Sequence, residues 1–341
     1  MTDLLQVPPT RIAPLELITR VLVEHDNIVL TTHVNADGDA VGSECAVATW
    51  LEQLGKTVHI VNPTPYPAQY RYLVRNPEWV ADIGTAAAAT ALQSAQVVLV
   101  LDTGEPKRIG KVASALSGRK VLLIDHHPRS EPGFTTDAAL IDTSACATGE
   151  LVYDLVSSAH LPSPWPDHLV QAVYAAIVTD TGSFRFSNTT PRSHALAGDL
   201  IRRGVDPEQE YKRLFGTVPL RRVQLLRAAL DTLEVDPDLP ITWISLPRSA
   251  MEAAGAGSED LDGVVEQARS VEGTEVAILF RETADGSTKI SLRSNGDFDV
   301  NAIARRFGGG GHIKASGAVI GAPMASAREK VLAAVRQAMR A

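Results

Sequence analysis

Acidic and histidine side chains follow four short apolar runs of this 341-residue chain. Two of the runs, 28–30 and 121–124, predict buried parallel strands, and the carboxyl ends of such strands form the edge at which open α/β sheets bind ligands. Carboxylates with a few imidazoles suit Mn²⁺ or Mg²⁺ better than structural Zn²⁺. We therefore predict one metal site, with the candidate ligands His33, Asp37, Asp39, Asp102, His126 and Asp180.

Repulsion between like charges is the physical reason for expecting a cation. Two carboxylates about 4 Å apart repel each other by roughly 4 kcal/mol at an effective dielectric constant near 20. Several such pairs would rival the whole stability of a domain, about 5–15 kcal/mol. For each aspartate taken alone, the alternative is that it caps the helix that follows its strand. Four aspartates together with His33 and His126 favour the metal site.

The spacing of the first motif indicates how two ions could share these ligands. Asp37 and Asp39 are separated by Gly38, which permits a tight backbone, so the two carboxylates can serve different ions. Two ions about 3.5–4 Å apart need a bridging carboxylate. Asp102 is the candidate bridge because it stands alone at the end of its own run, 97–101.

The second motif, Asp125-His126-His127, extends a predicted strand. Where strand geometry persists, only alternate side chains share a direction, so one histidine can bind a metal while the other faces a substrate. Asp125 can accept a hydrogen bond from an imidazole and so orient it. A polar surface turn is the alternative interpretation, which the preceding strand and the other acids disfavour.

A glycine run at 308–311 precedes His312 near the C-terminus. Residues without side chains allow backbone N–H groups to approach an anion closely, although a flexible linker would have the same composition. The run matches neither glycine pattern of the nucleotide-binding folds. Arg108, in the turn after Asp102, is a second candidate for binding phosphate, and a solvated surface arginine is its alternative.

The composition and net charge of the chain are those of a globular protein and limit its partners. Hydrophobic residues make up 45% of the chain and charged residues 21%, which is ordinary globular composition. A net charge of −8 argues against coating long nucleic acid but allows a local phosphate site. Cys45 and Cys146 form no CxxC pair, which suggests a reducing compartment. Neither a long apolar run nor a secretory leader is evident, so we expect a cytoplasmic protein without membrane association.

Length and the pattern of elements predict two α/β domains. We expect a catalytic domain over 1–204 with a mainly parallel sheet flanked by helices, a helical linker over 205–236, and a smaller mixed α/β domain over 237–341, with the active site in the cleft between the domains. Residues 207–233 have the pattern of one long amphipathic helix. Asp180 is placed like the other acids, after the apolar run 173–179, which overlaps a helix predicted over 165–178.

Taken together, these motifs resemble those of the DHH phosphoesterase superfamily. The resemblance rests on His33-x-x-x-Asp37-x-Asp39, Asp102, Asp125-His126-His127 and Thr179-Asp180-Thr181-Gly182. Arg293 and Gly309-Gly310-Gly311-His312-x-x-Ala315-x-Gly317 look like the DHH-associated C-terminal domain. The match covers nearly the whole chain, and its length and domain order are most similar to the NrnA type, nanoRNases that also act as phosphatases on 3′-phosphoadenosine 5′-phosphate.

The resemblance implies a homodimer with two Mn²⁺ ions in each site, for which Mg²⁺ could substitute. One ion would be bound by His33, Asp37 and Asp102, and the other by Asp39, Asp102, His126 and Asp180. His127, contacting the scissile phosphate, and Asp125 would be the catalytic residues. The substrate would be held by Arg108, Arg293, Ser294, Gly309, Gly310, Gly311 and His312.

The expected function is hydrolysis of di- to tetranucleotides such as pApA to 5′-mononucleotides. Further expected substrates are 3′-phosphoadenosine 5′-phosphate and, as in some relatives, cyclic di-AMP. An inorganic pyrophosphatase shares the metal ligands but would need a basic clamp in place of the glycine run. A RecJ-like exonuclease on long single strands is disfavoured by the acidic chain. A non-catalytic sensor of cyclic dinucleotides could lose metal ligands without penalty, whereas here all are present.

Overall fold

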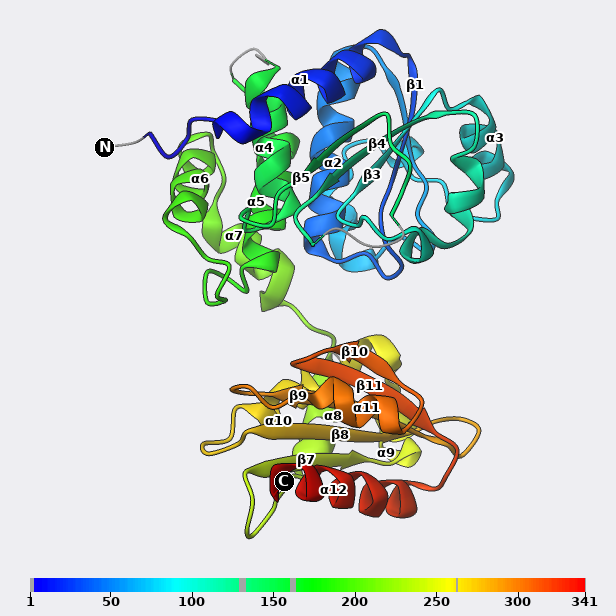
Figure 1. The fold of residues 1–341 in the computed structure, drawn as a ribbon, viewed down its shortest axis with the longest axis vertical. Coiled ribbons are helices and arrows are strands. Elements are labelled where there is room, and N and C mark those ends of the chain that lie inside the picture. The colour runs from blue at the N-terminus through cyan, green and yellow to red at the C-terminus, as the bar shows by residue number, and fades with distance from the viewer. Residues whose placement is uncertain (1–2, 129–132, 160–163, 262, 341) are drawn as a thin grey trace. The chain divides into compact units, whose positions relative to one another are not determined.

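The computed structural model describes residues 3–128, 133–159, 164–261 and 263–340 (Figure 1). The chain divides into two compact units, Met1–Thr217 and Val218–Ala341. The linker predicted over 205–236 is therefore divided between the units. No helix in the described parts of the chain is both long and apolar enough to span a membrane.

The first unit is built on a five-stranded parallel sheet in the order β2-β1-β3-β4-β5. Apolar, largely β-branched residues dominate its three central strands, which are buried almost throughout, as expected for a sheet covered on both faces. The chain runs outward from β1 to β2 and then returns to β3 on the other side of β1. The strands are β1 Asn27–Thr31, β2 Thr57–Ile60, β3 Val97–Leu101, β4 Lys120–Asp125 and β5 Ala138–Ile141.

Helices cover both faces of this sheet (Figure 1). Alternate strand residues separate the two cores: Leu30 and Leu99 pack under one helical layer, whereas Val29 and Val98 face the other. The larger layer consists of α1 Pro9–Glu24, α2 Gly38–Gln53, α4 Thr148–Ser158, α5 Asp167–Asp180 and α6 Pro191–Arg202. The opposite layer consists of α3 Ala86–Ser94 and the 3₁₀ segment η3 Pro106–Ala115. Shorter segments are η1 Ala68–Leu73, η2 Pro77–Trp79, α7 Pro207–Tyr211 and η4 Lys212–Gly216.

A buried ionic network joins the beginning of the chain to α4 and α6. Arg11 of α1 is almost fully buried, and its guanidinium lies 2.7 Å from Glu150, 2.8 Å from Asp154 and 2.7 Å from Asp142. Arg192 of α6 pairs with Glu150 and Asp154 as well. Each buried carboxylate of α4 therefore has two arginine partners, which such a group needs in a low-dielectric interior.

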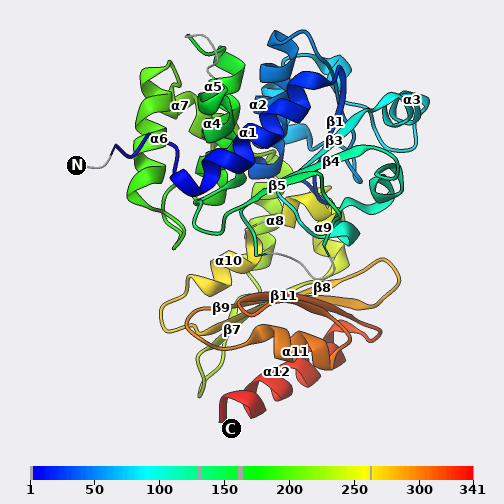
Figure 2. The same ribbon diagram turned by 45° about the horizontal axis from the view of Figure 1, so that its top comes forward.

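The second unit has a six-stranded mixed sheet in the order β10-β11-β9-β8-β7-β6. Only β7 and β8 are parallel, and the other neighbours are antiparallel. The strands are β6 Glu234–Val235, β7 Ile241–Leu246, β8 Val276–Glu282, β9 Thr288–Ser294, β10 Gly310–His312 and β11 Ala315–Ile320. The helices are α8 Leu220–Leu230, α9 Arg248–Ala254, η5 Ser258–Leu261, α10 Val264–Arg269, α11 Val300–Arg306 and α12 Met324–Arg340. Figure 2 shows α11 and α12 on one face of this sheet, opposite α8 and α10.

The α/β class and the parallel first sheet are confirmed, and the helix predicted over 165–178 corresponds to α5. The run before Asp180 therefore lies in a helix, which packs against α2 and α4 and is buried on nearly every side. One local prediction is wrong. The single helix predicted over 207–233 is broken. Gly216 ends the first piece and Pro219 caps the second, since proline cannot continue a helix.

Close packing of α2 on α5 requires a glycine at position 42. A Cβ atom there would lie 2.5 Å from the carbonyl oxygen of Ala172 and 2.9 Å from the Cβ of Ala176. We predict that Gly42→Ala lowers the free energy of unfolding by about 1–3 kcal/mol, as overpacking typically does. Urea unfolding measures the change.

Gly198 of α6 is the matched control, because a Cβ atom added there meets nothing within 4 Å. Gly198→Ala should leave stability unchanged or raise it by up to about 1 kcal/mol, since alanine is the better helix former. Equal effects of the two substitutions would contradict the packing argument.

Candidate metal centre

The predicted ligands gather where the strand order of the first sheet reverses. The loop after β1 carries His33 and Asp37, Asp39 lies in the first turn of α2, and Asp102 directly follows the neighbouring strand β3. A crevice beyond the carboxyl ends of two strands whose connections diverge is the usual ligand site of open α/β sheets. His126 follows the next strand, β4, and α5 contributes Asp180 at its last position.

The first cluster contains His33, Asp37 and Asp102. The Nε2 atom of His33 lies 3.2 Å from Asp102 Oδ2 and 3.7 Å from Asp37 Oδ2. The other ring nitrogen, Nδ1, donates to the carbonyl oxygen of Val34 at 2.9 Å. A hydrogen bond of this kind fixes the ring and leaves Nε2 free to bind a metal.

The second cluster contains Asp39, His126 and Asp180, and Asp102 lies beside it. His126 Nε2 lies 3.7 Å from Asp39 Oδ2, 3.6 Å from Asp102 Oδ1 and 3.6 Å from Asp180 Oδ2. These distances are too long for hydrogen bonds, and this buried Nε2 has no hydrogen-bond partner among the described residues. Atoms bound at about 2.1 Å to an octahedral ion lie roughly 3–4.2 Å apart, so the four groups fit a divalent cation.

Asp102 joins the two clusters because each of its oxygens faces a different one. Oδ2 faces His33, whereas Oδ1 faces His126 and accepts a hydrogen bond from Thr148 Oγ1 at 2.8 Å. The backbone of Asp102 is left-handed, with φ 62°, a conformation that aspartate tolerates better than most residues. This arrangement is the one that a bridging carboxylate requires.

The helix-capping alternative is correct for Asp37, which caps the helix that follows its strand, whereas Asp39 caps a different helix. Asp37 caps α2, accepting from Ala40 N at 3.1 Å, and its other oxygen faces His33. Asp39 instead accepts from the backbone nitrogens of Thr148 and Gly149 at 2.7 and 2.8 Å, so it caps α4. A capping role is therefore compatible with a position in a cluster that could hold a metal ion.

Neighbours of the ligands were not identified from the sequence. Thr148 and Gly149 begin α4, and the threonine- and serine-rich stretch 143–150 gives only a helix-start signal. Asn188 donates to the carboxylate of Asp180 at 3.0 Å and to its carbonyl oxygen at 3.1 Å, and no sequence pattern marks it. These residues hold the ligands in place without being ligands themselves.

The close approach of the acidic side chains shifts their pKa values. Burial, with the charges of Asp102 and Asp180, raises the pKa of Asp39 well above its usual range. Burial likewise raises the pKa of Asp180 to about 6. Burial also acts to raise the pKa of Asp102, but the hydrogen bond from His33 and the charges of the other histidines outweigh it and lower the pKa. The pocket thus disfavours its own negative charge, which a cation would relieve.

His127 pairs with Asp125 at the edge of the clusters, and its Nδ1 also lies 3.6 Å from Asp102 Oδ1, so that Asp102, His126 and His127 form a third group that could hold a metal ion. The carboxylate of Asp125, which is buried, accepts from Nδ1 of His127 at 2.9 Å and from its backbone nitrogen at 3.0 Å. This hydrogen bond raises the pKa of His127, and burial and the charge of Arg108 oppose the rise. The guanidinium of Arg108 is therefore close enough to influence the His127 ring.

In the second unit, the predicted substrate-binding residues lie at one end of three neighbouring strands. Arg293 of β9 pairs with Ala315 of β11, which pairs with His312 of β10, so the three form one cross-strand row. Cross-strand neighbours project from the same face of a sheet. Arg293 is held by Glu266 of α10 at 2.9 Å, and the hydroxyl of the neighbouring Ser294 is buried without a partner among the described residues.

The glycine run is not the flexible linker considered as an alternative. Gly310 and Gly311 belong to the edge strand β10, and a Cβ atom at Gly309 would lie 2.1 Å from the carbonyl oxygen of Gly317. Gly311 has φ 144°, which favours glycine. Close packing against β11 therefore accounts for Gly309 and Gly311, and binding of an anion by this run stays a prediction.

A buried carboxyl group supports the loop that carries His33. Asn62 accepts from the backbone nitrogen of Thr32 at 3.1 Å and donates to Glu44 at 2.9 Å. Glu44 of α2 is fully buried and forms no ion pair with the residues that the structure describes. Burial raises its pKa to about 8, so this side chain is largely neutral at pH 7.

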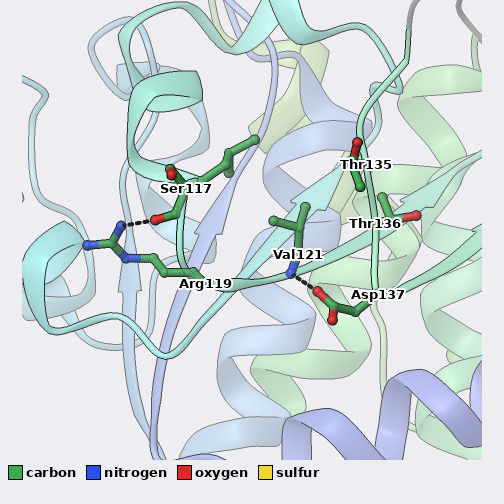
Figure 3. A pocket seen from close by; sticks show the side chains of 7 residues that line it. Ser117, Arg119, Val121, Thr135, Thr136 and Asp137 are labelled. Atoms are coloured by element: carbon green, nitrogen blue, oxygen red, sulfur yellow. Dashed lines mark hydrogen bonds between the residues drawn. The ribbon is translucent and has the colours of Figure 1, made fainter.

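A cavity of about 360 Å³ lies at the opposite edge of the first sheet, at the beginning of β4 and β5 (Figure 3). Its one arginine, Arg119, donates to the carbonyl oxygens of Ala115 and Ser117 at 2.6 and 3.1 Å. Asp137 is likewise bonded to Val121 N and Lys120. Arg119 is thus bonded to backbone carbonyls and Asp137 to Lys120 and a backbone nitrogen, and the described residues of the lining include no cluster of acids and histidines like that of the metal centre.

Fold and site together define a class of protein, the metal-dependent hydrolases. Carboxylates and imidazoles converge at the switch point of a parallel sheet, with one carboxylate shared between two clusters, as two-metal phosphoester hydrolysis requires.

Comparison with known proteins gives the family. Residues 27–177 match the DHH family, N-terminal domain, and residues 249–341 match the DHHA1 domain. The chain is 34% identical to the bifunctional oligoribonuclease and PAP phosphatase NrnA of Thermus thermophilus, covering 91% of this chain and 89% of that protein. It is 29% identical to NrnA of Bacillus subtilis, covering 89% and 92%. The chain belongs to the DHH family of phosphoesterases, in the NrnA branch.

A solved structure agrees with this assignment. An exopolyphosphatase-related protein of Bacteroides fragilis superposes with a TM-score of 0.87 at 25% identity, covering 96% of each chain. The similarity therefore extends over both units. The resemblance to the DHH superfamily, inferred above from short motifs, is confirmed.

Divalent cations should stabilise the protein, because they relieve repulsion among the aspartates. A cation at 100 times its dissociation constant raises the free energy of unfolding by about 2.7 kcal/mol. We predict a higher melting temperature with Mn²⁺ that EDTA reverses. His126→Ala, which affects only the second cluster, should reduce the number of ions bound from two to one in calorimetric titration.

His25→Ala, a histidine outside both clusters, is the control and should bind Mn²⁺ like the wild type. Full binding of two ions by His126→Ala would contradict the assignment of the second cluster.

Glu44 makes the stability of the protein depend on pH. Its folded pKa of about 8 exceeds the unfolded value of about 4.3, so its contribution is fully present below about pH 4 and is lost as pH rises through 8. Glu44→Gln removes this loss and should raise the melting temperature at pH 8 but not at pH 4.5. Linkage allows an effect of at most about 3.6 kcal/mol at pH 7.

Thermal melts of wild type and variant at several pH values test this prediction. The exposed Glu16 of α1 offers a control, because Glu16→Gln should change the melting temperature by the same amount at pH 4.5 and at pH 8. A Glu44→Gln variant that is less stable than wild type at pH 8 would show that the ionised form is required.

Proposed function

We propose that the protein is an Mn²⁺-dependent phosphoesterase that hydrolyses very short oligonucleotides, such as nanoRNA and pApA, to 5′-mononucleotides. The observation that carries the proposal is Asp102, whose two oxygens face two different ligand clusters. The activities in the names of the NrnA relatives support the substrate class, with 3′-phosphoadenosine 5′-phosphate as a second substrate. Cyclic di-AMP is a further candidate, because another relative is named a cyclic-di-AMP phosphodiesterase. The homodimer and the cytoplasmic location stay predictions.

Two Mn²⁺ ions, or Mg²⁺ in their place, would share the site through Asp102. His33 and Asp37 would complete the first position. Asp39, His126 and Asp180 would complete the second. Bound there, the ions would supply Lewis acidity toward a phosphate ester and neutralise charge that develops on its oxygens.

The remaining residues of the site would orient the substrate and hold protons. Asp125 accepts the Nδ1–H of His127, which leaves Nε2 of this half-exposed ring available to the scissile phosphate. A raised pKa favours the protonated ring, which would donate to a phosphate oxygen. Arg108 would add positive charge on the same side, since its guanidinium already influences His127.

The second unit would bind the part of the substrate away from the scissile bond. Arg293 and His312 lie in one cross-strand row, two strands apart, which places their Cα atoms about 10 Å from each other. Ser294 and the glycines of the run, Gly309, Gly310 and Gly311, adjoin this row. An arginine fork and the unpaired side of the edge strand β10 are suited to a terminal phosphate or ribose.

Replacing Asp102 tests the assignment directly. Asp102→Ala should abolish Mn²⁺-dependent release of AMP from pApA, because both metal positions lose a ligand. Chromatographic assay of AMP measures the loss, and circular dichroism checks the fold. Asp82→Ala, an exposed aspartate of the same unit, is the control and should keep full activity.

A substrate panel with Mn²⁺ under identical conditions ranks the candidates by kcat/KM. The panel contains pApA, a pentanucleotide, 3′-phosphoadenosine 5′-phosphate, cyclic di-AMP and inorganic pyrophosphate. We expect pApA and 3′-phosphoadenosine 5′-phosphate to have the highest kcat/KM. Turnover of pyrophosphate alone would reject the proposal in favour of a pyrophosphatase, and undiminished turnover by Asp102→Ala would refute the metal site.

A further inference from the structure

The turn that follows Asp180 has an unusual backbone. Gly182, Ser183 and Phe184 are three consecutive residues with left-handed conformation, at φ 55°, 58° and 63°. Gly182 is explained by the end of α5, where its nitrogen donates to Thr179 and the nitrogen of Ser183 donates to Val178. The next two residues continue the left-handed turn, although left-handed residues other than glycine normally occur singly. Thr181 closes the turn: its Oγ1 accepts from the Phe184 nitrogen at 3.1 Å, and its carbonyl oxygen accepts from the nitrogens of Arg185 and Phe186 at 2.9 and 3.0 Å.

This turn is fastened to the metal centre at both ends. Its first residues follow Asp180 directly, and Asn188 returns to donate to both the carbonyl and the carboxylate of Asp180. Asn188 also donates to the carbonyl oxygen of Cys146 at 2.8 Å, near the beginning of α4. Phe186 is two residues from Asn188, so their Cα atoms lie within roughly 7 Å of each other. The loop is therefore held next to a predicted metal ligand.

The turn sends its two phenylalanines into different environments. Phe184 is half-buried and stacks on His194, with ring centroids 4.8 Å apart. Phe186 is 52% exposed, and its ring lies over Gly182, where a Cβ atom would be 2.4 Å from Cζ. The ring is thus supported on one side by backbone while much of its surface remains open to solvent.

Arg185 is exposed beside Phe186 and is partly fixed. Its Nε atom donates to the carbonyl oxygen of Gly182 at 2.7 Å. Its two terminal nitrogens have no partner within the described residues. A guanidinium held by one nitrogen, with two donors free, is prepared for a phosphate at little cost in side-chain freedom.

We propose that Phe186 and Arg185 form a nucleotide subsite beside the metal centre, in which the ring stacks on a nucleobase and the guanidinium pairs with a phosphate. The proposal rests on the proposed function and names residues that would select nucleotides over simpler phosphate esters. Stacking on an aromatic ring tolerates any base, as an enzyme for short oligonucleotides of mixed sequence needs. The strained turn is then the means of holding the ring open to solvent next to the scissile phosphate.

Kinetics on two substrates test the stacking. One substrate is pApA, and the other is its base-free analogue, with the same ribose-phosphate backbone and no adenine. Phe186→Ala should raise KM for pApA about 10-fold, within the range measured for base stacking, and change kcat less than 2-fold. The base-free analogue should show no change. Phe186→Tyr keeps the ring and should restore KM, and Arg185→Gln should raise KM for both substrates.

Phe215→Ala is the matched control, because Phe215 is another exposed phenylalanine of the same unit and should leave both substrates unaffected. An unchanged KM for pApA in Phe186→Ala would overturn the inference while the proposed function stands. Equal losses on both substrates would also overturn it, since they would show that Phe186 only positions Asp180. Absence of pApA turnover by the wild type would overturn the proposed function and this inference together.

Discussion

The central constraint of this structure is the convergence of four carboxylates at one sheet edge. Asp37, Asp39, Asp102 and Asp180 come from three separate parts of the chain, and two imidazoles lie among them. Without a cation such an arrangement opposes folding through repulsion and desolvation. The surrounding structure must therefore hold these groups together by other interactions. The N–H groups of α4 bind Asp39, Thr148 binds Asp102 and Asn188 binds Asp180.

The conformations around the site follow from the same constraint. Asp102 and Asn35 both have left-handed backbones, in the loops that end β3 and β1. Residues in such conformations persist where the surrounding structure determines them, and they are common at functional sites. Between these loops, the backbone nitrogen of Val34 donates to the carbonyl oxygen of Arg108 at 2.8 Å. The first histidine motif and the turn after Asp102 are thus joined directly, so that movement of one would disturb the other.

Much of this site could be predicted from sequence because its ligands follow strands that are easy to recognise. Runs such as 97–101 and 121–124 are long enough and apolar enough to fix their type, and parallel strands bring their carboxyl ends to one edge. Asp180 follows a similar apolar run but ends a helix, because a helix buried on nearly every side has the same composition as a buried strand. Sequence patterns did not mark Glu44 and Asn188, whose roles arise from contacts between residues distant in sequence. The packing of the glycine run against β11 was hidden for the same reason.

The ionic network around Arg11 has a consequence for synthesis of the protein. Arg11 belongs to α1, yet its partners Asp142, Glu150 and Asp154 are 131 to 143 residues further along. Until they emerge, burying that guanidinium would strand an unpaired charge in an apolar interior. Helix α1 therefore stays in solvent while the strands of the sheet are synthesised. Glu150 also accepts a hydrogen bond from the backbone nitrogen of Cys146 and so holds the turn before α4. Docking of α1 and completion of the pocket therefore occur together, late in folding.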